Sequence, residues 1–457
     1  MNGQSNISLY SDIPEIIESP VTMTEPNSVI NIFEGPFILK SDEDILQVNG
    51  IIYFTWGPDL GVNFTCIYKD AAKEFLKIDA KAEYLDIVID HLIFGKCLVT
   101  GTSTTNLSND VAITGTAFQK IIKGDQTIPV EKIRFSIPNL RAFHGLAVKK
   151  IKSDGMKGIR GRIILDNEDY QIILDKASDY NELNTALNSR GGYLIQYGGE
   201  LIYKKGSITF ENIHDTLSCF DTFITFLNGR RTSAFFVHGI VNSEVKWIDY
   251  TEYPLDSYKQ VTTWPQKHSI DGINKIWGKF YSIWQNKDDK NFLTSAVHWY
   301  VEANGNSGLS EGAIIMAQTA LELIYNWLLI ENKKILIGKD SENINAANKL
   351  RLLLSHLKIS YKVPIAFTQL QKFINDNDII DAPDAIAQIR NAIVHSQMEK
   401  RRKLSVISSK TKFEALQLSI HYIELSLLYI LEYSELYFDR CCRAKFAKEG
   451  EKRPPWI

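Results

Sequence analysis

Arg390, Asn391 and His395 form the one cluster in this sequence whose residue types and spacing indicate chemistry. An arginine side chain keeps its positive charge at physiological pH, and a histidine side chain gains and loses a proton near neutrality. Cleavage of an RNA strand by acid and base catalysis requires those two properties, because one group must stabilise charge and another must transfer protons. The cluster therefore predicts phosphodiester cleavage without a metal or a cofactor.

The segment that carries the cluster is expected to be a helix. Asp381 can cap its start, and Pro383 fits its first turn. At 100° per residue the isoleucines fall on one side, and the polar residues fall on roughly the opposite side. The polar side contains Asp384, Gln388, Asn391 and His395. A core face and a wet face are thereby separated, and Gln388 could support the site.

The spacing alone is weak evidence, because similar arginine and histidine pairs occur elsewhere. Arg351 and His356 have the same separation, and Arg231 and His238 a slightly larger one. Arg351 is followed by three leucines that must be buried, and the segment from Arg231 to His238 is expected to run from a helix end into a strand, so both pairs are better explained as structure. The alternative to a catalytic role is that Arg390 forms a surface ion pair and that His395 is a helix-face residue without a catalytic function.

Other charged residues near the cluster each allow a functional and a structural interpretation. The run Lys400, Arg401, Arg402 and Lys403 could hold RNA phosphates, or could be cations at a helix end that balance its dipole. Glu322 could support the arginine as its partner, although a solvated glutamate on a helix is the simpler interpretation. A third motif, Gly308 to Gly312 around Ser310, matches the nucleophile elbow of serine hydrolases but lacks the strand that the elbow needs.

Length and composition indicate a multidomain globular protein. The 457 residues exceed the size of a single core, and 44% of them are hydrophobic with a net charge of -3. That charge offers no global attraction to nucleic acid, so RNA must meet a local basic patch. The five cysteines show no metal-ligand spacing. No signal segment and no stretch of membrane-spanning length is evident, which predicts a cytoplasmic protein without membrane contact.

Hydrophobic periodicity changes from two to 3.6 near residue 265. We expect a loosely attached polar leader at 1–30, an antiparallel β-rich domain at 31–264, a helical bundle at 265–447 and a tail at 448–457. Two hairpins are expected in the β-rich domain, one joining 163–165 to 170–174 and one turning at Gly198 and Gly199. In the bundle, two apolar stripes mark long helices. They are Ile314, Ala317, Leu321, Ile324 and Leu328, and Phe413, Leu416, Ile420, Ile423, Leu427 and Ile430, the second opened by a capping box of Thr411 and Glu414.

The residues from Arg390 to His395 resemble the R-[polar]-x-x-x-H motif of HEPN-fold ribonucleases, and the segment 311–322 is similar to the first long helix of the ApeA-like HEPN group. In that group a β-rich domain precedes the HEPN bundle, which is the order of elements here. The resemblance implies an endoribonuclease of prokaryotic anti-phage defence, in which the arginine and histidine of two subunits meet across a homodimer. It implies that Arg390 and His395 are catalytic, that Asn391 assists, and that the products carry 2′,3′-cyclic phosphates.

We therefore expect an α+β multidomain protein whose C-terminal all-α HEPN bundle cleaves RNA as a homodimer or higher oligomer. Its RNA could be tRNA, and the N-terminal domain could sense a phage-derived trigger of abortive infection. No metal and no cofactor are expected. The alternative from a different class is a non-catalytic module that binds RNA or nucleotides and dimerises within a regulatory or defence complex.

Overall fold

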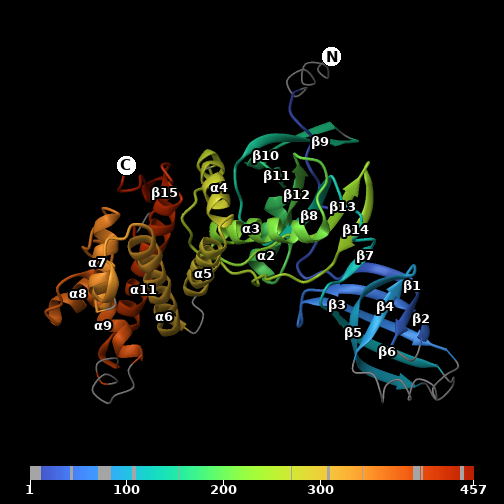
Figure 1. Ribbon diagram of the computed structural model, residues 1–457, viewed down its shortest axis with the longest axis horizontal. Coiled ribbons are helices and arrows are strands. Elements are labelled where there is room, and N and C mark those ends of the chain that lie inside the picture. The colour runs from blue at the N-terminus through green and yellow to red at the C-terminus, as the bar shows by residue number, and fades with distance from the viewer. Residues whose placement is uncertain are drawn as a thin grey trace. The chain divides into compact units, whose positions relative to one another are not determined.

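A computed structural model (Figure 1) describes residues 12–41, 45–69, 84–104, 110–153, 155–268, 270–305, 309–341, 343–394, 402, 405–442 and 447–457 of the chain. The chain divides into two compact units, Met1–Ser218 with Thr232–Lys259 and Cys219–Arg231 with Gln260–Ile457. The first unit consists mainly of antiparallel strands and the second mainly of helices. The expected α+β multidomain fold, with a β-rich region before a helical region, is confirmed at this level.

The first strands close into an antiparallel barrel, drawn in blue to cyan in Figure 1, with the order β1-β2-β3-β6-β5-β4. These strands are β1 (Ile30–Lys40), β2 (Ile45–Thr55), β3 (Gly61–Tyr68), β4 (Leu85–Ile89), β5 (Leu92–Thr104) and β6 (Val111–Phe118). Alternate residues of β2, including Leu46, Val48, Ile52 and Phe54, are buried because side chains of a strand point to opposite faces in turn. Pairing of β1 with β4 closes the barrel, so these strands leave no free edge.

The second sheet of this unit has, as described, eight strands in the order β7-β14-β13-β8-β12-β11-β10-β9. Its strands are β7 (Ile122–Gly124), β8 (Lys132–Pro138), β9 (Leu146–Lys152), β10 (Gly155–Asp166), β11 (Tyr170–Lys176), β12 (Ile195–Tyr203), β13 (Phe235–Val241) and β14 (Glu244–Asp249). Two helices interrupt the strands, α2 (Tyr180–Arg190) and α3 (Phe210–Asn228). The boundary between the two units falls within α3. Gly229, at a φ of 71°, directly follows α3 and ends it.

One of the two expected hairpins is confirmed and the other is wrong. Strands β10 and β11 pair from Ile163 with Leu174 to Asp166 with Gln171. Gly198 and Gly199, in contrast, lie inside the continuous strand β12 and not in a turn. A Cβ atom at Gly199 would lie 2.2 Å from the ring of Phe135. The glycines therefore serve close packing on both faces of the strand, a role that sequence does not distinguish from a turn.

The described part of the leader is not loosely attached, so that expectation is wrong. The Ile16 N–H donates to the carbonyl of Lys149 at 2.9 Å, and the Lys149 N–H donates to the carbonyl of Pro14 at 2.9 Å. The Ile17 N–H donates to Oδ2 of Asp175 at 2.6 Å, and Met23 is buried in the hydrophobic core. Backbone hydrogen bonds to the outermost strand β9 satisfy groups that would otherwise be open, and this fixes the leader.

The helical unit consists mainly of α-helices. Its elements are α4 (Ile270–Trp284), α5 (Lys287–Asn304), α6 (Leu309–Tyr325), the π-helical η2 (Asn326–Asn332), the 3-10 helix η3 (Gly338–Ser341), α7 (Ala346–His356), α8 (Thr368–Asp376), α9 (Ala382–Val394), α11 (Ser409–Ile430), β15 (Tyr437–Phe438), η4 (Ala447–Gly450) and β16 (Glu451–Lys452). Helix α11 packs on α5, α6, α8 and α9, and α7 also packs on α9. The expected tail is part of this fold, because β16 pairs with β15 and the Trp456 Nε1–H donates to the carbonyl of Tyr433 at 3.2 Å.

The two predicted apolar stripes lie on α6 with η2 and on α11. Every residue of the first is buried, and every residue of the second except Phe413, which is 49% exposed. Contrary to the sequence-based expectation, Leu309–Asn332 is long and apolar enough to cross a membrane by length and composition, but 56% of its most apolar window is buried inside the protein. That burial is typical of the core helix of a soluble protein.

The start of α11 differs from the expected capping box. The Thr411 N–H donates to Oγ of Ser408 at 3.1 Å, so Ser408 is the N-cap. Glu414 turns away and accepts the N–H groups of Gln369 and Leu370 at 2.9 and 2.7 Å. It therefore caps α8, a helix remote in sequence, and the local motif is overridden by a tertiary contact.

Candidate functional site: a helix with an uncommitted arginine and a buried His-Asp-Cys cluster

Helix α9 forms where the sequence predicts it. The Asp384 N–H donates to Oδ1 of Asp381 at 3.0 Å, which confirms Asp381 as the cap. Ile386 and Ile389 are buried, while Gln388 is exposed and Asn391 is half-buried. The core face and the wet face are thus separated as expected, and the described helix ends at Val394.

Arg390 lies on α9 with its side chain half-buried. Its Nη1–H donates to Oδ1 of the neighbouring Asn391 at 3.2 Å. Its Nε is buried and has no hydrogen-bond partner among the described residues. A guanidinium has five N–H donors, and the described side chains accept hydrogen bonds from few of those of Arg390. This cation can therefore still bind an anion.

The two arginines of the similar sequence pairs are committed to ion pairs instead. Arg351 donates from Nε and Nη2 to the carboxylate of Asp381 at 2.6 and 2.8 Å. Arg231 contacts Glu302, and its companion His238 lies on strand β13. The interpretation of both pairs as structural is supported by these contacts.

His395, Lys400, Arg401 and Lys403 lie outside the described residues, so the structure does not place the histidine or most of the basic run. Arg402 is described, and its side chain is exposed. The Ser405 Oγ–H donates to the carbonyl of Arg402 at 2.7 Å, which is a local backbone contact. The guanidinium of Arg402 is therefore on the surface.

The two residues expected to support the arginine do not contact it. Glu322 accepts a hydrogen bond from Nζ of Lys349 at 2.5 Å, and Gln388 donates from Nε2 to Oδ2 of Asp384 at 3.3 Å. Glu322 is thus a solvated glutamate on a helix and pairs with a lysine, which agrees with the simpler interpretation of its role. Ser310 lies in the first turn of α6, after helix α5 and not after a strand, which argues against a hydrolase elbow.

A second cluster, which sequence reasoning missed, centres on the end of α11 and the segment that follows it. Arg440 donates from Nε to Oε2 of Glu424 at 2.9 Å and from Nη2 to Oε1 at 2.5 Å. Both side chains are 1% exposed. The Tyr300 hydroxyl donates to Oε1 of Glu424 at 2.8 Å, and Oδ1 of Asn304 accepts from Arg440 at 3.1 Å. This network ties α5, α11 and the segment around Arg440 together.

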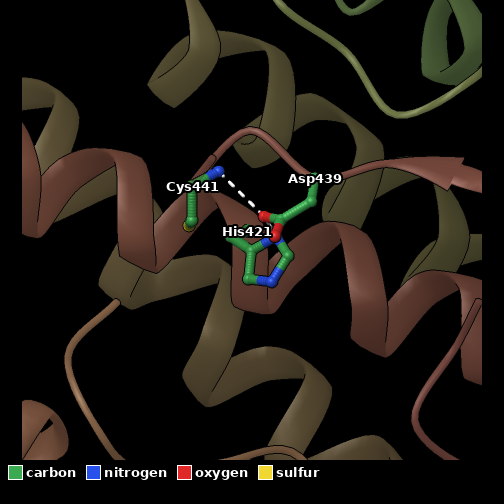
Figure 2. Close-up of side chains that lie close together, drawn as sticks. All are labelled: His421, Asp439 and Cys441. Carbon is green, nitrogen blue, oxygen red and sulfur yellow. Dashed lines mark hydrogen bonds and ion pairs between the residues drawn. The ribbon is translucent and has the colours of Figure 1, made fainter. Parts of the chain in front are cut away.

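Directly beside that network lie His421, Asp439 and Cys441, all buried (Figure 2). One possible ligand atom from each lies within 4.8 Å of the others. The His421 Nδ1 is 3.6 Å from Oδ1 of Asp439 and is buried without a hydrogen-bond partner. The Cys441 N–H donates to Oδ1 of Asp439 at 2.9 Å, and Nζ of Lys452 contacts Oδ2.

Burial controls the protonation of this cluster. It raises the pKa of the Cys441 thiol well above its ordinary value, and the negative charge of Asp439 acts in the same direction. Burial also lowers the pKa of His421 against the opposing charge of Asp439. Although burial alone would raise the pKa of Asp439, the neighbouring His421 and Lys452 hold it below its usual range. At neutral pH the cluster therefore holds a neutral imidazole, a neutral thiol and a carboxylate.

A sequence signal for this cluster is difficult to recognise. Asp439 and Cys441 are close in sequence, but His421 comes from the preceding helix, and the intervening residues form no regular ligand spacing. The sequence shows the adjacent cysteines Cys441 and Cys442, but the structure places only the Sγ atom of Cys441 in the cluster. Cys442 is half-buried and its Sγ contacts the carbonyl of Glu449 at 3.8 Å.

The comparisons with known proteins cover most of the chain. Residues 125–261 match the family described as the YopA central domain, and residues 286–451 match the YopA C-terminal domain. The SPbeta prophage-derived uncharacterized protein YopA of Bacillus subtilis (strain 168) is 25% identical over 428 residues, which cover 93% of this chain and 94% of that relative. No solved structure matches the chain. The chain is thus similar, over nearly its whole length, to a prophage-derived protein.

Proposed function

We propose that the helical unit is a metal-independent endoribonuclease of the HEPN type, in which Arg390 and His395 are catalytic and Asn391 assists. The observation that carries this proposal is the state of Arg390. Its guanidinium is held in place by a well-formed helix and by Asn391, but no carboxylate of the described chain neutralises it. An arginine whose only role was structural would be expected to have a partner like that of Arg351.

The proposed reaction divides the work between two side chains. The imidazole of His395 takes the proton from a ribose 2′-hydroxyl, and the 2′-oxygen attacks the adjacent phosphorus. Arg390 stabilises the negative charge on the phosphorane oxygens through charge-assisted hydrogen bonds. The protonated imidazole then gives its proton to the departing 5′-oxygen, so one product carries a 2′,3′-cyclic phosphate and the other a 5′-hydroxyl.

Asn391 fits an assisting role. Its Oδ1 accepts a hydrogen bond from Nη1 of Arg390, so it fixes the plane of the guanidinium before the substrate binds. A planar, pre-oriented arginine can offer two parallel N–H groups to a phosphate. The basic run Lys400–Lys403, including the exposed Arg402, supplies the local attraction to RNA that a chain of net charge -3 needs.

Apolar side chains left on the surface of the helical unit support the proposed homodimer. Val394 at the end of α9 is 43% exposed, Val406 is 80% exposed and Phe413 in the first turns of α11 is 49% exposed. Phe413 lies in a sequence stripe whose other members are core residues, so its exposure is unusual for that stripe. A second copy of the chain packed there would cover these residues and bring two sets of Arg390 and His395 together.

The biological setting is proposed from the relatives. The prophage-derived origin of the similar protein gives a phage context, in which a ribonuclease that cuts cellular RNA such as tRNA would abort infection. The β-rich unit would hold the nuclease inactive in the cytoplasm until a phage-derived trigger binds. A HEPN module that only binds RNA is the competing outcome of the test below.

The experiment compares purified full-length wild type with His395→Ala on total RNA and tRNA. We expect cleavage by wild type and loss of cleavage by His395→Ala, while circular dichroism and chromatographic size stay unchanged. His356→Ala is the matched control, since His356 belongs to a similar sequence pair but lies on α7 next to Tyr429. Undiminished cleavage by folded His395→Ala would refute the assignment, and RNA binding without cleavage by wild type would favour the non-catalytic module.

A further inference from the structure

We propose that His421, Asp439 and Cys441 form a binding site for a zinc ion, separate from the proposed nuclease residues. Each side chain contributes a different type of donor atom, and these atoms lie within 4.8 Å of one another. Zinc is bound in proteins by this set of thiolate, imidazole and carboxylate groups. Ligand atoms around a tetrahedral zinc lie about 3.3–3.6 Å apart, given the usual metal-to-ligand distances. Small side-chain rotations would bring the three donors to that separation.

The state of His421 is the second observation that points to a ligand. His421 is 8% exposed, and its Nδ1 atom has no hydrogen-bond partner in the described chain. The Nδ1 already lies 3.6 Å from Oδ1 of Asp439, which is close to the nitrogen-to-oxygen edge of a zinc tetrahedron and too long for a hydrogen bond. An unsatisfied buried nitrogen costs stability, and a metal ion would remove that cost.

A cysteine, a histidine and an aspartate together could also form a nucleophilic triad, but this cluster does not fit one. A cysteine nucleophile needs a lowered pKa and an accessible sulfur, whereas Cys441 as a residue is 4% exposed and burial raises the pKa of its thiol. Furthermore, a triad places its acid and its nucleophile at different nitrogens of the imidazole. Here one donor atom of each side chain lies within 4.8 Å of the other two, and Figure 2 shows the three side chains close together.

Neighbouring residues hold the donors in place. The Cys441 N–H donates to Oδ1 of Asp439, and Nζ of Lys452 contacts Oδ2. These contacts orient the carboxylate and leave one lone pair of Oδ1 for the metal. Arg440, between the two ligands in sequence, is fixed by Glu424 and Asn304. Hydrogen bonds thus anchor the segment that carries Asp439 and Cys441 without a metal ion, and such support orients metal ligands.

The three side chains border a pocket. His421, Asp439 and Cys441 all line a pocket whose other walls include Tyr422 and Tyr437. Three protein ligands and an open fourth position are the arrangement in which zinc also holds a water molecule. Because cysteine binds zinc as the thiolate, binding of the zinc ion replaces the Cys441 proton and forms a metal–thiolate bond. Each zinc ion bound should thus release one proton from the protein at neutral pH.

The test uses the full-length protein, purified with a chelator and then dialysed, with zinc and cobalt chlorides as probes. We expect one zinc ion per chain, and a thiolate-to-cobalt charge-transfer absorption when cobalt is bound. Cys441→Ser should remove that absorption and weaken zinc binding by about 100-fold or more. Calorimetry in two buffers of different ionisation enthalpy should show release of about one proton per zinc ion.

Cys442→Ser is the matched control, because this adjacent thiol contacts the Glu449 carbonyl and offers no ligand to the cluster. It should keep both the stoichiometry and the cobalt absorption. If Cys441→Ser fails to fold, Asp439→Asn provides the same comparison with the shape of the side chain retained. Zinc binding that is absent from wild type, or that survives in folded Cys441→Ser and Asp439→Asn, would overturn the proposal. Neither outcome would affect the nuclease assignment, which rests on different residues.

Discussion

Replacement of Arg440 by methionine is expected to destabilise the helical unit strongly. The guanidinium makes two hydrogen bonds to Glu424, and both side chains are 1% exposed. It also donates to Oδ1 of Asn304 at 3.1 Å and to the carbonyl of Thr262 at 2.9 Å. Methionine fills a similar volume but donates to none of these oxygens, so the change removes the partner and leaves the buried carboxylate behind.

The magnitude follows from the burial of Glu424. Removing one partner of a buried ion pair costs about 3–5 kcal/mol, because an uncompensated charge stays in a medium of low dielectric constant. Only the Tyr300 hydroxyl would still donate to this carboxylate among the contacts described above. Replacing Glu424 by glutamine in the same chain removes the charge, and should recover about 1–3 kcal/mol. Recovery should be incomplete because Asn304 and Thr262 still lack their donor.

Urea denaturation of the full-length variants, read out by hydrogen exchange at the amides of α5 and α11, would assign the loss to the helical unit. Lys275→Met is the control, since the Lys275–Glu435 pair lies on the surface of the same unit and its loss should leave the midpoint unchanged. A cost below about 1 kcal/mol for Arg440→Met would refute the reasoning. Strict additivity of the Arg440 and Glu424 replacements would refute it as well.

Four further substitutions have defined outcomes. Gly199→Ala should cost about 1–3 kcal/mol in thermal unfolding, because its Cβ would meet the Phe135 ring, whereas Gly278→Ala in open space on α4 should stabilise by about 0.5–1 kcal/mol. Burial lowers the pKa of His238 to about 4. In the unfolded chain this histidine is protonated below about pH 6.5, whereas in the folded chain it stays neutral down to about pH 4. The free energy of unfolding should therefore fall by about 3 kcal/mol between pH 6.5 and pH 4. His238→Gln should remove this part of the decrease, which unfolding midpoints would measure. Arg390→Lys should lower the cleavage rate by about 100-fold or more with unchanged melting temperature, because lysine cannot offer two parallel N–H groups.

The elements that local sequence determines were the ones predicted correctly. The stripe from Ile314 to Leu328 is buried throughout, and Asp381 caps α9 as its position before Pro383 indicates. Both features depend on residues within a few turns of each other. A hydrophobic period of 3.6 and a carboxylate before a first turn carry the same meaning in most folds.

Predictions failed where a residue acts on a distant segment. Glu414 caps α8 and not its own helix, and Gly199 admits the ring of Phe135 from strand β8. The cluster of His421, Asp439 and Cys441 belongs to the same class, because only the fold brings the helix and the later segment together. Spacing along the chain carries no information about such contacts, so they require a structure.

The chemistry of RNA ends tests the proposed nuclease most directly. Total RNA from cells expressing wild type, His395→Ala or His356→Ala would be sequenced after enzymatic treatments that distinguish 5′-hydroxyl from 5′-phosphate ends. We expect new fragments with 5′-hydroxyl and 2′,3′-cyclic phosphate ends in wild type and His356→Ala, and their absence in His395→Ala. Fragments with 5′-phosphate ends, or the same new ends in all three strains, would contradict cleavage by Arg390 and His395.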